Sequence, residues 1–137
     1  MSLAVLDTDM LAEVFKRRNA TVCGHAGVYL ETHHQFSFSA ITYFEVLRGL
    51  RHKRSARLLT QFADLCERSL IYPITFEVLG RAADLWSTAH SEGHSRRDAD
   101  LIIGATAIEQ RRTLVTGNTR HFEWMPGLSI VNWRDAL

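Results

Sequence analysis

Short apolar runs alternate with longer segments of helical periodicity along this 137-residue chain, and this alternation limits the possible fold most strongly. The first run, residues 3–6, stops at Asp7, as a buried parallel strand does when its carboxyl end reaches a crevice. A helical pattern over residues 10–18 follows at once. Strands followed directly by helices predict one α/β domain over residues 1–137, with a mostly parallel sheet and right-handed crossovers.

The same alternation continues to the end of the chain. Further helices are expected at residues 20–30, 43–50, 55–67, 76–92 and 101–108, and further strands at 36–38, 70–74, 114–116 and 129–131. The expected N-caps are Thr8 or Asp9 for the helix over 10–18, Asn19 for 20–30, Ser39 or Thr42 for 43–50, and Thr75 for 76–92. Gly93 is expected to end the helix over 76–92. Residues 101–108 are apolar nearly all round, which predicts a buried helix.

Charge and cysteine content say little about function. The formal net charge is +1, so any binding to nucleic acid must come from a local basic patch. Cys23 and Cys66 form no CxxC or Cys/His cluster, and we expect free thiols in a reducing cytoplasm. The N-terminus lacks a basic region and no apolar run approaches the roughly 20 residues of a membrane span. We therefore expect neither a signal peptide nor a membrane anchor.

Acidic side chains stand at several strand ends and helix starts. They are Asp7, Glu45, Asp98 with Asp100, and, as an amide, Asn118. Parallel strands bring such positions to one edge of a sheet, where crowded carboxylates raise each other's pKa unless a cation neutralises them. Oxygen ligands without Cys or His select Mg²⁺ or Mn²⁺. The chemistry expected from such a site is metal-assisted hydrolysis of a phosphodiester, without a nucleophilic side chain.

Four segments resemble the successive motifs of PIN-domain ribonucleases, specifically VapC-type toxins of toxin-antitoxin modules. They read LDTDML, ITYFEVLRGL, DADLIIGATAIEQ and TLVTGNTRHFEWMPGLSIVNW, in family order and across essentially the whole chain. The resemblance implies a parallel sheet flanked by helices and Mg²⁺-dependent endonucleolytic cleavage of RNA. It also implies a homodimer and inhibition by a small antitoxin protein.

The resemblance also assigns individual residues. Asp7 matches the first acid of the family, Glu45 its helical glutamate, and Asp100 the aspartate before the LIIGATA helix. Asn118 matches the fourth position, where relatives have Asp or Asn, and His121 stands where some relatives have an additional acid. An amide supplies no negative charge. We therefore expect a dominant single-metal site.

Some assignments keep a simpler alternative. Asp98 or Asp9 would reach the metal through water, although Asp9 would also cap its helix. Taken singly, Asp7 and Asp100 read as helix caps and Glu45 as a solvated glutamate. Their coincidence at three matched positions favours a site.

Several basic residues are candidate RNA contacts. Arg96 and Arg97 precede the Asp98 turn, and Arg120 lies in the TGNTRHF loop. The basic run from Arg48 to Arg57 reads equally well as a phosphate-contacting patch or as a solvated helix end.

The aromatic residues and Thr116 are expected to be structural. Trp86, Trp124 and Trp133 read as core or dimer anchors, and Phe44, Phe62 and Phe76 as core. Thr116 reads as an ordinary strand-end threonine rather than a supporting hydroxyl.

Two functional alternatives stay open. In the first, LDTD is the start of a haloacid-dehalogenase-like phosphotransferase with Asp7 as the nucleophile, although the expected downstream motif is missing. In the second, the fold binds RNA or an antitoxin without turnover, as Asn118 permits.

Overall fold

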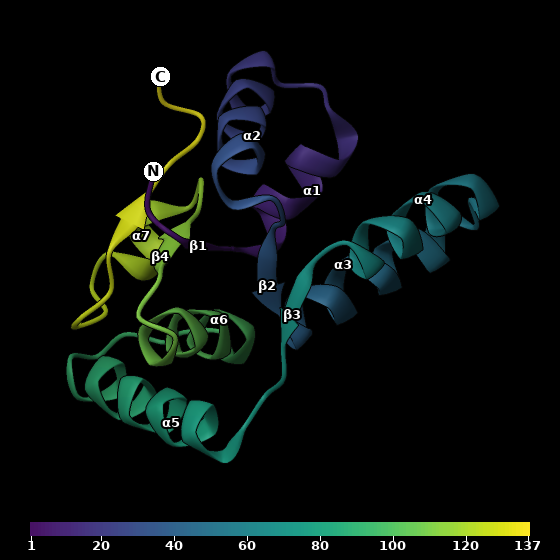
Figure 1. The fold of residues 1–137 in the computed structure, drawn as a ribbon. Helices are drawn as coiled ribbons and strands as arrows, with labels where there is room; N and C mark the ends of the chain where they lie inside the picture. Colours follow the sequence, from purple (N-terminus) through teal and green to yellow (C-terminus); the bar gives the residue numbers. More distant parts are fainter.

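The computed structural model describes residues 1–137 and shows short parallel strands between layers of helices (Figure 1). In chain order, the elements are β1 (Ala4–Leu6), α1 (Thr8–Lys16), α2 (Ala20–His33), β2 (Ser37–Ser39), α3 (Ala40–Lys53), α4 (Ala56–Glu67), β3 (Leu70–Tyr72), α5 (Phe76–Ser91), α6 (Asp98–Glu109), β4 (Thr113–Val115), α7 (Thr119–Phe122) and β5 (Ile130–Val131). None of these helices combines the length and the apolar character needed to cross a membrane.

All strand pairs are parallel, which confirms the predicted α/β fold with a parallel sheet. β1, β4 and β5 form one three-stranded sheet in the order β1-β4-β5, and β2 pairs with β3 in a second. The two sheets adjoin along β1 and β2, where the Ser37 hydroxyl donates a hydrogen bond of 3.0 Å to the Ala4 carbonyl. The chain therefore passes from β1 to a neighbour on one side and later returns on the other. Such a reversal opens a crevice at the carboxyl end of β1.

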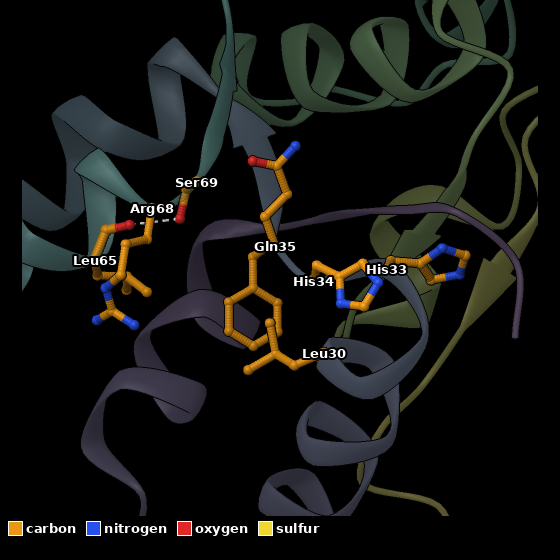
Figure 2. A pocket seen from close by; sticks show the side chains of 8 residues that line it. Leu30, His33, His34, Gln35, Leu65, Arg68 and Ser69 are labelled. Atoms are coloured by element: carbon orange, nitrogen blue, oxygen red, sulfur yellow. Dashed lines mark hydrogen bonds between the residues drawn. The ribbon is translucent and has the colours of Figure 1, made fainter.

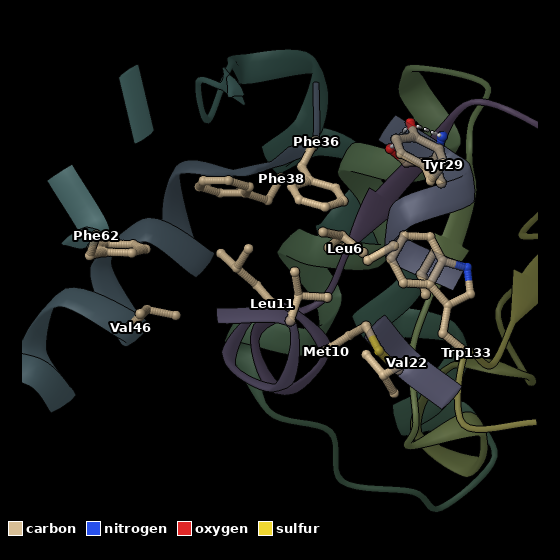
Figure 3. Close-up of a cluster of buried hydrophobic side chains, with 14 of the residues drawn as sticks. Leu6, Met10, Leu11, Val22, Tyr29, Phe36, Phe38, Val46, Phe62 and Trp133 are labelled. Atoms are coloured by element: carbon tan, nitrogen blue, oxygen red, sulfur yellow. Dashed lines mark hydrogen bonds between the residues drawn. The ribbon is translucent and has the colours of Figure 1, made fainter. Parts of the chain in front are cut away.

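Two apolar clusters lie on opposite sides of the strands. Ala4 and Leu6 of β1 belong to the cluster under α1 and α2 (Figure 3), whereas Val5 belongs to the cluster under α5 and α6. The split follows from the alternation of side chains along a strand. Helix α6 is buried over most of its length and packs against α5, as its uniformly apolar sequence predicts.

Capping residues in the sequence correctly predicted where most of the expected helices begin or end. Asn19 and Thr75 cap α2 and α5 as expected, and Gly93 follows α5 with a φ of 76°. The predicted cap of α1 was wrong, because Asp7 accepts the hydrogen bond from the Met10 amide. Helix α7 was missed, since four polar and aromatic residues carry too little periodicity to distinguish a helix from a loop.

The expected core status of Phe44 and Phe76 was wrong. Phe76 is 90% exposed and Phe44 50%, whereas Phe62 and Trp133 are buried as predicted. Trp86, expected in the core or at a dimer interface, is 49% exposed and lies outside the core. Phe44 follows Tyr43 on the outer side of α3, and Phe76 opens α5 beyond the end of the sheet. Both cysteines are free thiols, as expected.

Candidate active site

Four segments meet at the crevice beyond β1. Asp7 follows β1, Glu45 lies in the second turn of α3, Asp100 in the first turn of α6, and Asn118 follows β4. Side-chain contacts link each segment to at least one of the others. Asp98 and Arg120, which the sequence also offered as site residues, lie further out.

Asp7 is a buried carboxylate with both oxygens hydrogen-bonded. Its Oδ1 accepts from the Met10 amide at 2.8 Å, and its Oδ2 accepts from the Thr116 hydroxyl at 2.6 Å. Burial raises the pKa of Asp7 from 3.8 to about 6, and the negative charges of Asp9 and Asp100 add to the rise, while the two hydrogen bonds oppose it. Asp7 therefore caps α1 and also lies in the field of neighbouring acids.

Thr116 is a supporting hydroxyl, so its interpretation as an ordinary strand-end threonine was wrong. The Thr116 side chain is fully buried, and its Oγ1 also accepts a hydrogen bond of 2.9 Å from the backbone N–H of Asn118. It thereby connects the β4 loop to Asp7 across the sheet. Its position at the end of a strand was visible in the sequence, but the parallel pairing of that strand with β1, which brings Thr116 to Asp7, was not.

Glu45 is held toward α1. Its Oε1 accepts a hydrogen bond of 2.7 Å from the Thr8 hydroxyl, which lies 3.2 Å from the hydroxyl of Thr42. Arg48, one turn further along α3, lies 3.5 Å from Oε2, and only 11% of the Glu45 side chain is exposed. Glu45 is therefore a partly buried site residue and not a freely solvated glutamate.

Two basic side chains contact Asp100. Arg97 approaches it as a fork, with Nη2 3.1 Å from Oδ1 and Nε 3.4 Å from Oδ2, and His121 Nδ1 lies 3.3 Å from Oδ2. The contact with Asp100 raises the pKa of Arg97, and the charges of Glu45 and Asp9 contribute further. The guanidinium of Arg97 thus lies in the combined field of three acids.

Asn118 contacts the acid at the start of α1. Its Nδ2 donates a hydrogen bond of 2.6 Å to Oδ2 of Asp9. Gly117 beside it is packed under Arg134, whose guanidinium carbon lies 2.5 Å from where a Cβ would stand. Arg134 in turn donates to Glu13 at 3.0 Å, so the segment after β5 holds the β4 loop against α1. Sequence reasoning did not identify Arg134.

The remaining candidate residues are more peripheral. Asp98 is exposed and lines a hollow beside Trp86 and Leu101, between α5 and α6, on a different side of α6 from Asp100. Arg120 is exposed on α7. Asp9, and not Asp98, is the acid whose charge acts on Asp7 and Arg97.

The donor chemistry fits a hard divalent cation, but the side chains are not arranged around one. The acids offer only carboxylate oxygens, as Mg²⁺ and Mn²⁺ prefer. No group of three or more His, Cys, Asp or Glu side chains converges on a common centre, because Asp100 is turned to Arg97 and Glu45 to Thr8. A metal bound here would have to displace Arg97 from Asp100.

A separate hollow of about 440 Å³ lies at the opposite end of the strands (Figure 2). It is bordered by His33, His34 and Gln35 ahead of β2 and by Arg68 ahead of β3. The acids of the crevice do not take part in it.

Comparisons with solved structures identify the fold. VapBC2 from Rickettsia felis bound to a promoter DNA fragment superposes with a TM-score of 0.82 at 20% identity, covering 95% of this chain and 98% of that one. DNA-bound VapBC from Salmonella typhimurium also gives 0.82 at 20%, covering 97% and 99%. VapBC-1 from nontypeable Haemophilus influenzae gives 0.82 at 21%, covering 96% and 98%.

Sequence comparison extends this likeness. A protein named Ribonuclease VapC19 from Mycobacterium tuberculosis is 28% identical over 95 residues, which are 69% of this chain and 72% of that protein. The family model for the PIN domain matches residues 4–127, which include Asp7, Glu45, Asp100 and Asn118. This chain therefore belongs to the PIN-domain family.

Proposed function

We propose that this protein is an endoribonuclease toxin that hydrolyses RNA phosphodiester bonds with Mg²⁺, or Mn²⁺, held by Asp7, Glu45 and Asp100. The observation that carries the proposal is a buried Asp7 with Asp9 and Asp100 close enough for their charges to act on it, since burial first and then these two charges raise the pKa of Asp7 to about 6. Membership of the PIN-domain family and the ribonuclease name of a relative support it.

Each residue has a distinct role in the proposed reaction. A bound divalent ion would supply Lewis-acid polarisation of the phosphate and activation of water. Asp7 and Asp100 are the principal ligands and Glu45 completes the acidic pocket. Thr116 orients Asp7, and Thr8 orients Glu45.

Basic and amide groups around the acids would bind the RNA. Arg97, once released from Asp100, contacts the RNA phosphate, with Arg96 and Arg120 as further contacts. The Asn118 amide, through its Nδ2 group, donates to a phosphate oxygen or a water. Asp98 and Asp9 were the two candidates for a contact with the metal through water. We assign that contact to Asp9, because its charge acts on Asp7.

The test is cleavage of a panel of structured RNAs by the purified chain, freed of any antitoxin, with Mg²⁺ or Mn²⁺. D7N, E45Q and D100N are each expected to reduce the rate at least about 100-fold, because they remove charge that the metal needs. D64N is the matched control, since Asp64 is an exposed acid on α4, and it should cleave like wild type. Cleavage that persists in EDTA, or a wild-type chain that cleaves nothing, would overturn the proposal.

A second candidate, an RNA-binding or antitoxin-binding module without turnover, is favoured by the contact of Arg97 with Asp100 and by the amide at Asn118. Calorimetry with Mg²⁺ beside the cleavage assay separates the two functions. A module without turnover would bind RNA and form no metal-dependent products. The phosphotransferase alternative is disfavoured, since both oxygens of Asp7 accept hydrogen bonds and the side chain is buried.

We also propose a small cognate antitoxin as partner, homodimerisation and a cytoplasmic location. Several structural neighbours are toxin-antitoxin complexes by name, among them one from Klebsiella pneumoniae at 25% identity and a TM-score of 0.74. If a gene for a small protein lies directly upstream, its co-expression with this chain should yield a stable complex. Sedimentation of the free chain should give about twice the monomer mass of 15.6 kDa.

A further inference from the structure

We propose that Arg96 and Trp124 form a stacking subsite for one base of single-stranded RNA at the mouth of the acidic crevice. The guanidinium carbon of Arg96 lies over the Trp124 ring, 5.1 Å from its centre. The inference rests on the proposed function, since it presumes that RNA is the ligand of the crevice. It adds a group that recognises the base to the groups that contact phosphate.

Both Arg96 and Trp124 are connected to residues of the acidic site. Arg96 directly precedes Arg97, which contacts Asp100. The indole Nε1 of Trp124 donates a hydrogen bond of 2.8 Å to the carbonyl of His121, and the ring of His121 also contacts Asp100. Each member of the Arg96–Trp124 pair is therefore connected through one residue to Asp100, the carboxylate proposed to hold the metal, and the proposal puts the pair where a nucleotide next to the scissile phosphate would pass.

Arg96 has unused hydrogen-bonding capacity. Its Nε is buried and has no hydrogen-bond partner, although the residue as a whole is only half-buried. The comparable pair of Arg112 over Tyr72, at 5.5 Å, differs because Arg112 donates to the Ser37 hydroxyl at 3.3 Å. A buried donor without an acceptor is costly in a folded protein unless a ligand supplies one. Arg96 thus differs from Arg112, and also from Arg48, which lies over the Phe44 ring at 5.1 Å but contacts Glu45 at 3.5 Å, because its Nε lacks an acceptor.

The chemistry of the pair suits a nucleobase. RNA-binding proteins stack unpaired bases on aromatic rings and on arginine guanidinium planes. Trp124 is partly buried against the apolar cluster of α5 and α6, so the indole supports the guanidinium from one side. The other face of the guanidinium takes the base, and its N–H groups donate to base or phosphate oxygens.

The experiment measures binding of a fluorescent single-stranded RNA in EDTA by anisotropy, so that no cleavage occurs. A matched oligonucleotide lacking its bases serves as the second ligand. R96K retains the charge but loses the planar stacking surface. We expect R96K and W124L to weaken binding of the complete RNA about five-fold or more, and to leave binding of the base-free strand within about two-fold of wild type.

Controls separate stacking from folding. R112Q alters the comparable pair at the amino end of the strands and should bind both ligands as wild type does. W124F keeps an aromatic face, so it should lose less affinity than W124L and provides the test if W124L fails to fold. Melting curves of every variant show which proteins are folded.

The outcomes distinguish this inference from the proposed function. If wild type binds and cleaves RNA but R96K leaves base-dependent affinity unchanged, the subsite is refuted while the nuclease stands, and the same holds for a folded W124L. Equal loss on both ligands means that Arg96 contacts only phosphate, which also overturns the subsite. A wild-type chain that neither binds RNA nor cleaves it with Mg²⁺ or Mn²⁺ refutes both.

Discussion

Asp7 serves two demands that conflict at neutral pH. As the cap of α1 it accepts the Met10 amide, and as a site residue it lies buried near Asp9 and Asp100. Its pKa of about 6, against 3.8 for an ordinary aspartate, reflects first the burial and then the neighbouring charges. In the metal-free chain, the buried carboxylate lowers the free energy of unfolding at neutral pH. This is the expected consequence of keeping a carboxylate in place for a cation.

The first prediction concerns stability and pH at this residue. Since the folded chain holds the Asp7 proton more tightly than the unfolded one, its contribution to stability is greatest below pH 3.8 and is lost as pH rises through about 6. The loss amounts to about 3 kcal/mol at most. D7N removes this loss, so its free energy of unfolding should exceed that of wild type at pH 7.5 and approach it near pH 4.

Urea titrations at the two pH values, without divalent ions, measure the effect. Adding Mg²⁺ should stabilise wild type and leave D7N unchanged. A D7N protein less stable than wild type at pH 7.5 would mean that its hydrogen bonds outweigh its burial.

The second prediction concerns Arg97 as a competitor of the metal. The contact between Arg97 and Asp100 must break before Asp100 can bind a cation. Because 68% of the Arg97 side chain is exposed, the contact is worth no more than about 1 kcal/mol. R97A should therefore bind Mn²⁺ up to about five-fold more tightly, as measured by electron paramagnetic resonance.

R81A is the matched control for R97A. Arg81 forms an exposed ion pair of 2.8 Å with Glu109 at the far end of α6, and its removal should leave Mn²⁺ affinity unchanged. Weaker binding by R97A would show that Arg97 supports the site instead of competing with the metal.

At the scale of elements, α6 connects the acidic site to the core. Its first turn carries Asp100, while its middle, at Gly104, packs against Met125 and Phe122. A Cβ at Gly104 would overlap the sulfur of Met125. The absence of a side chain therefore allows α7, which carries His121, to approach α6.

The third prediction compares two helical glycines. G104A should lower the free energy of unfolding by about 1–2 kcal/mol, because overpacking outweighs the better helix propensity of alanine. Gly80 on α5 has nothing within 4 Å of its would-be Cβ, so G80A should raise the free energy of unfolding by about 0.5–1 kcal/mol. Denaturant melts of both variants provide the comparison, and equal effects would contradict the close packing of α6 on Met125.

Element order was predictable, because periodicity and capping are local. The strand before Asp7, the cap at Thr75 and the buried α6 all follow from neighbouring residues. The side of a helix on which a residue lies can also be predicted from the sequence. Asp98 and Asp100 are two residues apart, or about 200° around a helix, so both cannot face the same crevice. That argument was available from the sequence and would have favoured Asp9 over Asp98.

At the scale of the whole molecule, the last residues complete the core. Trp133 is 1% exposed and packs with Tyr29 and Phe36 on the α2 side of the strands (Figure 3). The carbonyl of Asp135 lies 2.8 Å from Nε2 of His25. The two ends of the chain thus stabilise one cluster together.

The fourth prediction follows from this closure. W133A should cost about 3–5 kcal/mol of unfolding free energy, as large buried aromatics do. W86A removes a tryptophan that is 49% exposed and should cost less than about 1 kcal/mol. Urea unfolding followed by circular dichroism measures both, and similar costs would place Trp133 outside the core.

The sequence by itself determined the order of the strands and of every helix except α7, and the presence of an acid or amide at each segment of the crevice, since these depend on local periodicity and on strand ends. Only the tertiary structure decided that Arg97 and His121 contact Asp100, that Thr116 supports Asp7, and that Phe44 and Phe76 face solvent. The physical reason is distance along the chain. Thr116 lies 109 positions from Asp7, and no local pattern encodes which side chains meet once separate segments pack together.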